Sequence, residues 1–296
     1  MLRFTAMLTV SLLFAGVLVA QPNPSNLYLF DLAKENDQSY ALTKPTFLTP
    51  VNPGGYNNQP QFASSELLLF SSGAISDSFQ TDIYALNLAQ NTITKITETA
   101  ESEYSPTLMP DYFYFSAVRV EADPDQTQRL WQFPLDRLNN GKPVFPNIRN
   151  IGYHYWISRY KVLLYIVNSP NLLIIADTRD GSWEKVSSDV GRCFKRLPDG
   201  RVAFIQKESE DLWMLCALNT QDFTATGIVP VLAGVEDFVV LNDGSFLMGR
   251  GSRMYHFNPK APEKGWVEIA DLRDYGINAI TRISTNGNGR LVLVSE

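Results

Sequence analysis

Cysteine and histidine are scarce in this chain, with two of each among 296 residues. Two histidines are too few for a multi-histidine zinc or other transition-metal centre. The sequence also lacks a Gly-x-Ser-x-Gly nucleophile motif and a glycine-rich loop of the kind that holds phosphate groups. It has no block of basic residues, and its formal net charge is −6. The charge therefore argues against nucleic acid as a partner.

Long hydrophobic runs are absent after the first twenty residues. Residues 1–20 resemble a secretory leader, with Arg3 near the start, an apolar stretch from Leu8 to Val19, and Ala20 at the expected cleavage point. The stretch is short for a membrane span, although an uncleaved anchor is the alternative. We therefore expect residues 21–296 to be a single periplasmic or secreted domain without stable membrane insertion. Loss of Arg3 with the leader changes the net charge to −7.

A short motif recurs six times along the remaining chain. It consists of an aliphatic residue, a large and usually aromatic one, a spacer, a second apolar residue and, usually, Asp or Asn. Its large residues stand at positions 28, 84, 131, 174, 213 and 255, at intervals of 56, 47, 43, 39 and 42 residues. These intervals are close to the length of a four-stranded propeller blade. The sequence therefore predicts an all-β, six-bladed β-propeller with the motif on the third strand of each blade.

Turn residues and apolar runs outline the strands within a blade. In the fourth blade we expect an inner strand over residues 192–197, a turn at Pro198-Asp199-Gly200, a second strand over 202–206 and a third over 211–218. A fourth strand is expected within residues 223–232. The turn has a physical basis, because Asp bonds its own backbone and Gly adopts a positive φ without steric cost.

The strands at the two chain ends are offset by one blade. The first motif has no strand pair before it, and residues 279–295 supply two strands with no third strand after them. The simplest solution is a shared blade, in which the N-terminal strands over residues 27–31 and 40–48 pair with the C-terminal ones. Such pairing closes the ring and leaves no open edge.

The two cysteines are predicted to lie on one blade. Cys193 falls on the inner strand and Cys216 on the third strand, two strand spacings or roughly 9–10 Å apart. That distance is beyond the reach of a disulfide. Both are therefore expected to be free and buried, unless a register shift brings them closer.

Several segments together resemble the repeats of TolB-like proteins, which bacteria export. They include the turn and strand at residues 197–204, the blade openings at 58–62 and 104–108, and the third strands that begin at Asp82 and Asp211. The resemblance covers residues 26–296 and implies a six-bladed propeller. It is specific for architecture and leaves function open.

Polar residues should gather where each blade begins, because the loop from the outer strand of one blade to the inner strand of the next ends beside the central channel. Four of these six inward loops contain a glycine, which suits a tight turn. The predicted ligand-binding residues are Asn58, Glu103, Tyr104, His154, Arg192, Glu236, Asp237 and Asn278.

Three interpretations of this polar ring stay open. In the first, Arg192 and His154 recognise the anionic group of a small ligand between tyrosine walls. In the second, carboxylate and amide oxygens of the ring bind Ca²⁺. In the third, the side chains only solvate a water-filled channel. His256 lies within a third-strand motif and is expected to be structural.

We expect a propeller that acts as an extracytoplasmic scaffold, without a catalytic residue or a required cofactor. Its partner would be a small polar ligand, a glycan or another protein. The alternative is a Ca²⁺-dependent hydrolase of the lactonase or gluconolactonase type, in which Glu, Asn and Asp hold a central metal. The predicted ring resembles that set in composition only.

Export provides a first test. If residues 1–20 are a cleaved leader, the mature chain should begin at or near Gln21. N-terminal sequencing of protein recovered from the periplasm or the medium checks this, and a chain that still begins with Met1 would contradict it.

Overall fold

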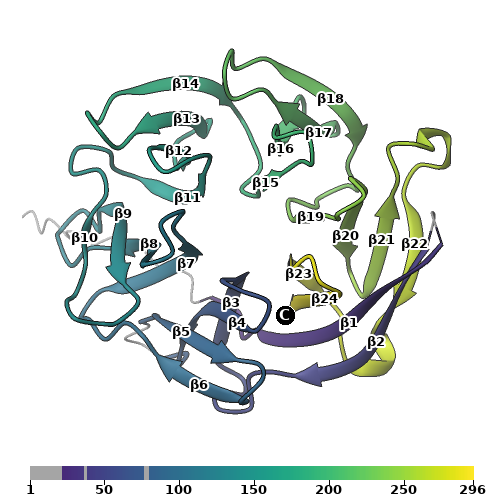
Figure 1. Ribbon diagram of the computed structural model, residues 1–296, viewed down its shortest axis with the longest axis horizontal. Coiled ribbons are helices and arrows are strands. Elements are labelled where there is room, and N and C mark those ends of the chain that lie inside the picture. The colour runs from purple at the N-terminus through teal and green to yellow at the C-terminus, as the bar shows by residue number, and fades with distance from the viewer. Residues whose placement is uncertain (1–21, 37–38, 77–79) are drawn as a thin grey trace, which may run out of the picture.

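The computed structural model describes residues 22–36, 39–76 and 80–296, so the predicted leader lies outside the described residues. The described chain forms six four-stranded antiparallel sheets arranged in a ring (Figure 1). This confirms the predicted all-β, six-bladed propeller. Within the described ranges, no helix has the length and apolar composition of a membrane span.

Five blades are each built from four consecutive strands, with the first strand nearest the centre (Figure 1). Blade 1 comprises β3 (Tyr56–Phe62), β4 (Leu67–Gly73), β5 (Asp82–Asn87) and β6 (Thr92–Lys95). Blade 2 comprises β7 (Ser102–Leu108), β8 (Tyr114–Val120), β9 (Gln128–Pro134) and β10 (Lys142–Pro143). Blade 3 comprises β11 (Ile151–Trp156), β12 (Lys161–Ile166), β13 (Leu172–Asp177) and β14 (Trp183–Ser188).

Blade 4 comprises β15 (Lys195–Arg196), β16 (Val202–Lys207), β17 (Trp213–Leu218) and β18 (Ala225–Pro230). Its inner strand is shorter than the predicted 192–197. Blade 5 comprises β19 (Phe238–Val240), β20 (Phe246–Arg250), β21 (Arg253–Phe257) and β22 (Val267–Asp271). Two short 3-10 helices, η1 (Pro262–Lys264) and η2 (Arg273–Tyr275), flank β22.

The closing blade is formed by both ends of the described chain. Its order is β2 (Ser39–Phe47), β1 (Asn26–Asn36), β24 (Arg290–Ser295) and β23 (Ile280–Thr285). Strands β1 and β24 are antiparallel, with Leu27 opposite Val294 and Leu29 opposite Val292. These four side chains are buried in one core cluster with residues of blade 1. The predicted ring closure is therefore confirmed.

The hairpin of β1 and β2 also reaches past β24 to blade 5. Asp243 in the β19–β20 turn accepts hydrogen bonds from Lys34 Nζ at 2.9 Å and Tyr40 Oη at 2.8 Å. Burial raises the pKa of Asp243, but hydrogen bonds from Ser245, Lys34 and Tyr40 outweigh this and hold it well below its usual value. The Tyr40 ring lies 5.2 Å from the ring of His256, which is buried as expected of a structural residue.

The second strand of each blade contributes three or four buried hydrophobic residues to the core. In β4, Leu68, Leu69 and Phe70 are buried in succession, and β24 is buried from Leu291 onward. Both faces of such a strand pack against neighbouring blades, so it appears in the sequence as a continuous apolar run rather than an alternation. This explains why six such runs could be recognised.

The turns after the inner strands of blades 4 and 5 have the predicted Asp-Gly chemistry. In blade 4, Asp199 Oδ1 accepts the Arg201 N–H at 3.0 Å, and Gly200 has a φ of +90°. The corresponding turn of blade 2 has Tyr112 at the glycine position, with a φ of +63°. This left-handed conformation costs a residue with a side chain about 1–2 kcal/mol.

Cys193 and Cys216 are both free and buried, as predicted. Burial raises the pKa of Cys193 to about 12, so its thiol stays protonated at neutral pH. The thiol donates to the Phe238 carbonyl at 3.3 Å, which makes it part of the contact between blades 4 and 5.

Closure of the ring predicts an effect on cooperativity. Deletion of residues 279–296 removes β23 and β24, exposing the edge of β1 and the apolar faces of two blades. We expect loss of the cooperative unfolding transition of the whole domain, measured by circular dichroism in urea. Removal of Glu296 alone is the control and should leave the transition unchanged. An unaltered transition after the longer deletion would contradict the closure.

Candidate functional site: the central cavity

A cavity of about 460 Å³ lies at the centre of the ring. Its lining includes Arg192, Asp237 and Arg282 where the blades begin, and Tyr112 and Arg196 at the opposite end of the inner strands. Because the ring converges here, residues far apart in the sequence become neighbours (Figure 1).

Positive charge predominates in the lining. The lining residues include four cationic ones and one carboxylate, and they are Arg192, Lys195, Arg196, Arg282 and Asp237. The chain as a whole is negative, at −6. A concave site with charge opposite to that of the whole protein concentrates anions locally.

Arg282 is the most enclosed of these cations, with a side chain only 11% exposed. Its Nη2 donates to Tyr153 Oη at 2.9 Å, and its Nη1 lies 3.6 Å from Asp237 Oδ2. Burial alone would raise the pKa of Tyr153, but the positive charges of Arg282 and Arg192 outweigh it and lower that pKa. Arg282 was not among the residues predicted from the sequence, whereas Asn278 was. The signal in the sequence was a charged residue between the apolar residues Ile280 and Ile283 of the last inner strand.

Arg192 lies beside Arg282 on the cavity wall. Its Nε is 3.3 Å from Glu236 Oε2, and its guanidinium lies 6.0 Å from the Tyr153 ring centre. Glu236 is shared, because its other oxygen pairs with Lys207. The structure therefore brings together three of the predicted residues, Arg192, Glu236 and Asp237, around Tyr153.

His154 also faces the cavity but is 8% exposed. Its Nε2 lies 2.7 Å from Ser116 Oγ, which also accepts the Trp156 indole N–H at 2.9 Å. A serine beside a histidine is the arrangement of a nucleophile and its base. Ser116, however, is fully buried, so a substrate has no access to its hydroxyl. The contact fixes β8 against β11.

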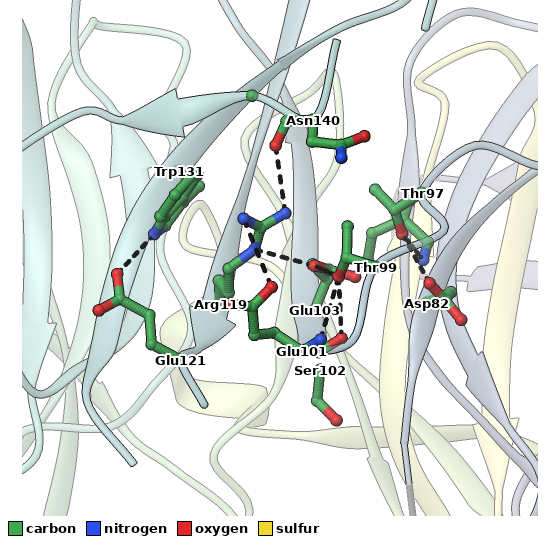
Figure 2. A network of polar contacts seen from close by, with 12 residues as sticks. Asp82, Thr97, Thr99, Glu101, Ser102, Glu103, Arg119, Glu121, Trp131 and Asn140 are labelled. Carbon is green, nitrogen blue, oxygen red and sulfur yellow. Dashed lines mark hydrogen bonds and ion pairs between the residues drawn. The ribbon is translucent and has the colours of Figure 1, made fainter. Parts of the chain in front are cut away.

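Glu103 does not line the cavity and instead lies in the contact between blades 1 and 2 (Figure 2). It is fully buried, and its Oε1 accepts hydrogen bonds from Arg119 Nε at 2.9 Å and Thr99 Oγ1 at 2.6 Å. Arg119 lies 4.0 Å from the Trp131 ring centre and donates to the Asn140 carbonyl. Burial raises the pKa of Glu103, only partly offset by Thr99 and Arg119.

Three further predicted residues do not line the cavity. The side chain of Asn58 contacts Ser25 and accepts the Gln59 N–H at 2.8 Å. Tyr104 packs edge-on against Tyr56, with ring centres 6.3 Å apart, and Asn278 is exposed on the surface. The oxygens considered for Ca²⁺ are thus dispersed. Over the described ranges, His, Cys, Asp and Glu side chains form no group of three that could hold a metal ion.

A second cavity of about 400 Å³ adjoins the first between blades 4, 5 and the closing blade. Trp213 and Arg250 line it, and it shares Arg192, Asp237 and Arg282 with the central cavity. These three residues therefore form a wall between the two spaces.

Comparisons with known proteins bear on the fold. No family model matches the chain, and no curated protein sequence does so either. Among solved structures, a TolB-type protein from Agrobacterium tumefaciens is 11% identical, with a TM-score of 0.63 over 93% of this chain and 98% of that one. TolB from Acinetobacter baumannii is 14% identical, with a TM-score of 0.57 over 94% of this chain. This chain spans 66% of that protein's length. The fold is that of TolB-like six-bladed propellers.

Enzymes share this fold. The oligogalacturonate lyase from Vibrio parahaemolyticus is 13% identical, with a TM-score of 0.51 over 92% of this chain and 98% of that one. At such identities the likeness is one of architecture, so the residues of the cavity must carry any argument about function.

The burial of His154 predicts a pH-dependent stability. Burial lowers its pKa from 6.5 to about 3, so the unfolded chain takes up this proton at a higher pH than the folded chain. The free energy of unfolding should then fall as the pH drops below about 6.5, by at most about 1.4 kcal/mol per pH unit. His154→Gln removes the titrating group and should reduce this fall.

Urea denaturation of both proteins at about pH 7 and about pH 4.5 measures the difference. Comparing the two proteins at each pH separates the contribution of His154 to the pH dependence of stability from that of Glu103. The raised pKa of Glu103 makes the folded state more stable as the pH falls, which is the opposite direction. Equal losses of stability in both proteins would contradict the assignment.

Proposed function

We propose that this chain is an extracytoplasmic propeller that binds a small anionic ligand in its central cavity. The observation that carries the proposal is the excess of cations, four against one carboxylate, around a cavity of about 460 Å³ in a negatively charged chain. The extracytoplasmic part is supported by the leader-like residues 1–20 and by the likeness to exported TolB-like propellers.

Arg192 and Arg282 are the proposed anchors of the anionic group. Arg192 contacts Glu236 through Nε, so its terminal nitrogens can meet a ligand carboxylate as a planar fork. Its side chain is 33% exposed, which gives a ligand access to it. Arg282 is more enclosed and would contribute charge from beside Tyr153.

Binding is proposed rather than catalysis. The contact of Ser116 with His154 at the cavity is closed to a substrate because Ser116 is fully buried. The thiol of Cys193 is buried, and its pKa is raised to about 12, the opposite of an activated nucleophile. The proposed ligand is a carboxylated molecule, and an acidic glycan or the acidic segment of a partner protein would present the same group.

Replacement of Arg192 tests the proposal. With galacturonate as the probe in isothermal titration calorimetry, Arg192→Ala should weaken binding by about 1.5–3 kcal/mol, or roughly 10- to 100-fold. Stability should change by less than about 1 kcal/mol, because the Arg192–Glu236 pair is partly exposed.

Arg201→Ala is the matched control. Arg201 belongs to the same blade and pairs with Asp199, but it does not line the cavity. Unchanged binding with a large loss of stability in Arg192→Ala would show that Arg192 is a structural contact between blades 4 and 5. That outcome would overturn the assignment.

A further inference from the structure

The turn after the inner strand of blade 2 contains a tyrosine where the corresponding turns of blades 4 and 5 have glycine. In Pro198-Asp199-Gly200, the Gly200 N–H donates to Leu197 O at 2.9 Å. In Pro110-Asp111-Tyr112, the Tyr112 N–H donates to Met109 O at 3.0 Å in the same way. Gly200 and Tyr112 both have a positive φ, of +90° and +63°. The two turns are therefore the same structure with a different residue at the strained position.

Packing does not account for the tyrosine. The Tyr112 residue is 72% exposed, so its ring buries little apolar surface in return for the strained backbone. Glycine would form this turn with less strain, as it does in blade 4. A strained residue whose side chain makes no compensating packing contact is a candidate for a binding role.

The position of the side chain supplies the second observation. Tyr112 lines the central cavity at the end opposite Arg192, together with Ser158 and Arg196. Phe113, the next residue, is 75% exposed but does not line the cavity. The strained backbone thus holds one of two adjacent aromatic rings at the mouth of the cavity.

Cations stand at both ends of the same cavity. Arg192 precedes β15 and Arg196 ends it, and both line the space. Four residue steps, of which only the last lies within β15, place the two backbones on the order of 10 Å apart. A ligand that reaches both cations must therefore be longer than one sugar ring and must carry more than one anionic group.

We propose that the mouth at Tyr112 is a second subsite, and that the ligand is an acidic oligosaccharide. The inference rests on the proposed binding of an anion at Arg192 and extends it. One carboxylate lies at Arg192, a second meets Arg196, and the ring of Tyr112 packs against the C–H face of a sugar. Hydroxyl and amide groups of Ser158 and Gln61 in the lining suit the sugar hydroxyls. An apolar peptide side chain would instead require an enclosed pocket, and the Tyr112 ring is open to solvent.

Tyr112→Gly separates binding from folding. The variant should fold with an unchanged or higher melting temperature, because glycine relieves the strain in this turn. Its affinity for trigalacturonate should fall about tenfold, while its affinity for galacturonate, which occupies only the Arg192 end, stays that of the unmodified protein. Tyr112→Phe should retain the affinity for trigalacturonate, and Phe113→Ala is the matched control that should change neither affinity.

Other outcomes overturn the inference in distinguishable ways. If Tyr112→Gly binds trigalacturonate as tightly as the unmodified protein, Tyr112 has no role in binding. If the unmodified protein binds galacturonate and trigalacturonate equally, the second subsite is absent while the proposed function stands. If a hexaglutamate peptide binds and trigalacturonate does not, the ligand class is wrong. If none of these anions binds, the proposed function itself fails.

Discussion

The pairing of β1 with β24 is the interaction on which the rest of the structure depends. The blades follow one another around the ring, and this antiparallel pair is the point where the two ends of the described chain meet. The cavity exists only in a closed ring, because Tyr153, Arg192, Asp237 and Arg282 come from four different blades. The contacts of Lys34 and Tyr40 with Asp243 extend the same closure to blade 5.

The molecule uses similar ion pairs in two different environments. Arg119 and Glu103 are sealed between two blades, with side chains 4% and 0% exposed (Figure 2). Arg282 and Asp237 are also largely enclosed, but both line the central cavity. The first pair has no route to a ligand and serves the contact between blades. In the proposed function, the second pair would exchange part of its interaction for a ligand group.

Local patterns made the fold predictable from the sequence. Second strands such as β4 are continuous apolar runs, and turns such as Pro198-Asp199-Gly200 have their own backbone chemistry, so neither requires knowledge of distant residues. The strands at the two chain ends are offset by one blade, and this offset predicted that they share one blade. The separation of Cys193 and Cys216 on one blade followed from the same strand assignment.

The site was less predictable because the inner strands are irregular. Register shifts occur between Asn58 and Gln61, between Tyr104 and Thr107, and between Ile280 and Arg282. A bulge changes the alternation of side chains, so a residue assigned to the channel by counting can point elsewhere. Arg282 follows one of these bulges and was missed for this reason. Glu103 and Asn278 were placed at the channel because each stands where a blade begins, but Glu103 points into the contact with blade 1 and Asn278 lies before β23 on the surface.

The distribution of charge around the cavity is not one that stability alone would favour. Two of the four cations in the lining, Arg192 and Arg282, are paired with Glu236 and Asp237, and a buried ion pair such as Arg282–Asp237 is often no more stabilising than apolar residues of similar size. The strained Tyr112 at the mouth adds a further energetic cost in the free protein. An anion that neutralises the cations and packs on the tyrosine would offset both costs together. In the proposed function, ligand binding would therefore stabilise the cavity relative to the free protein.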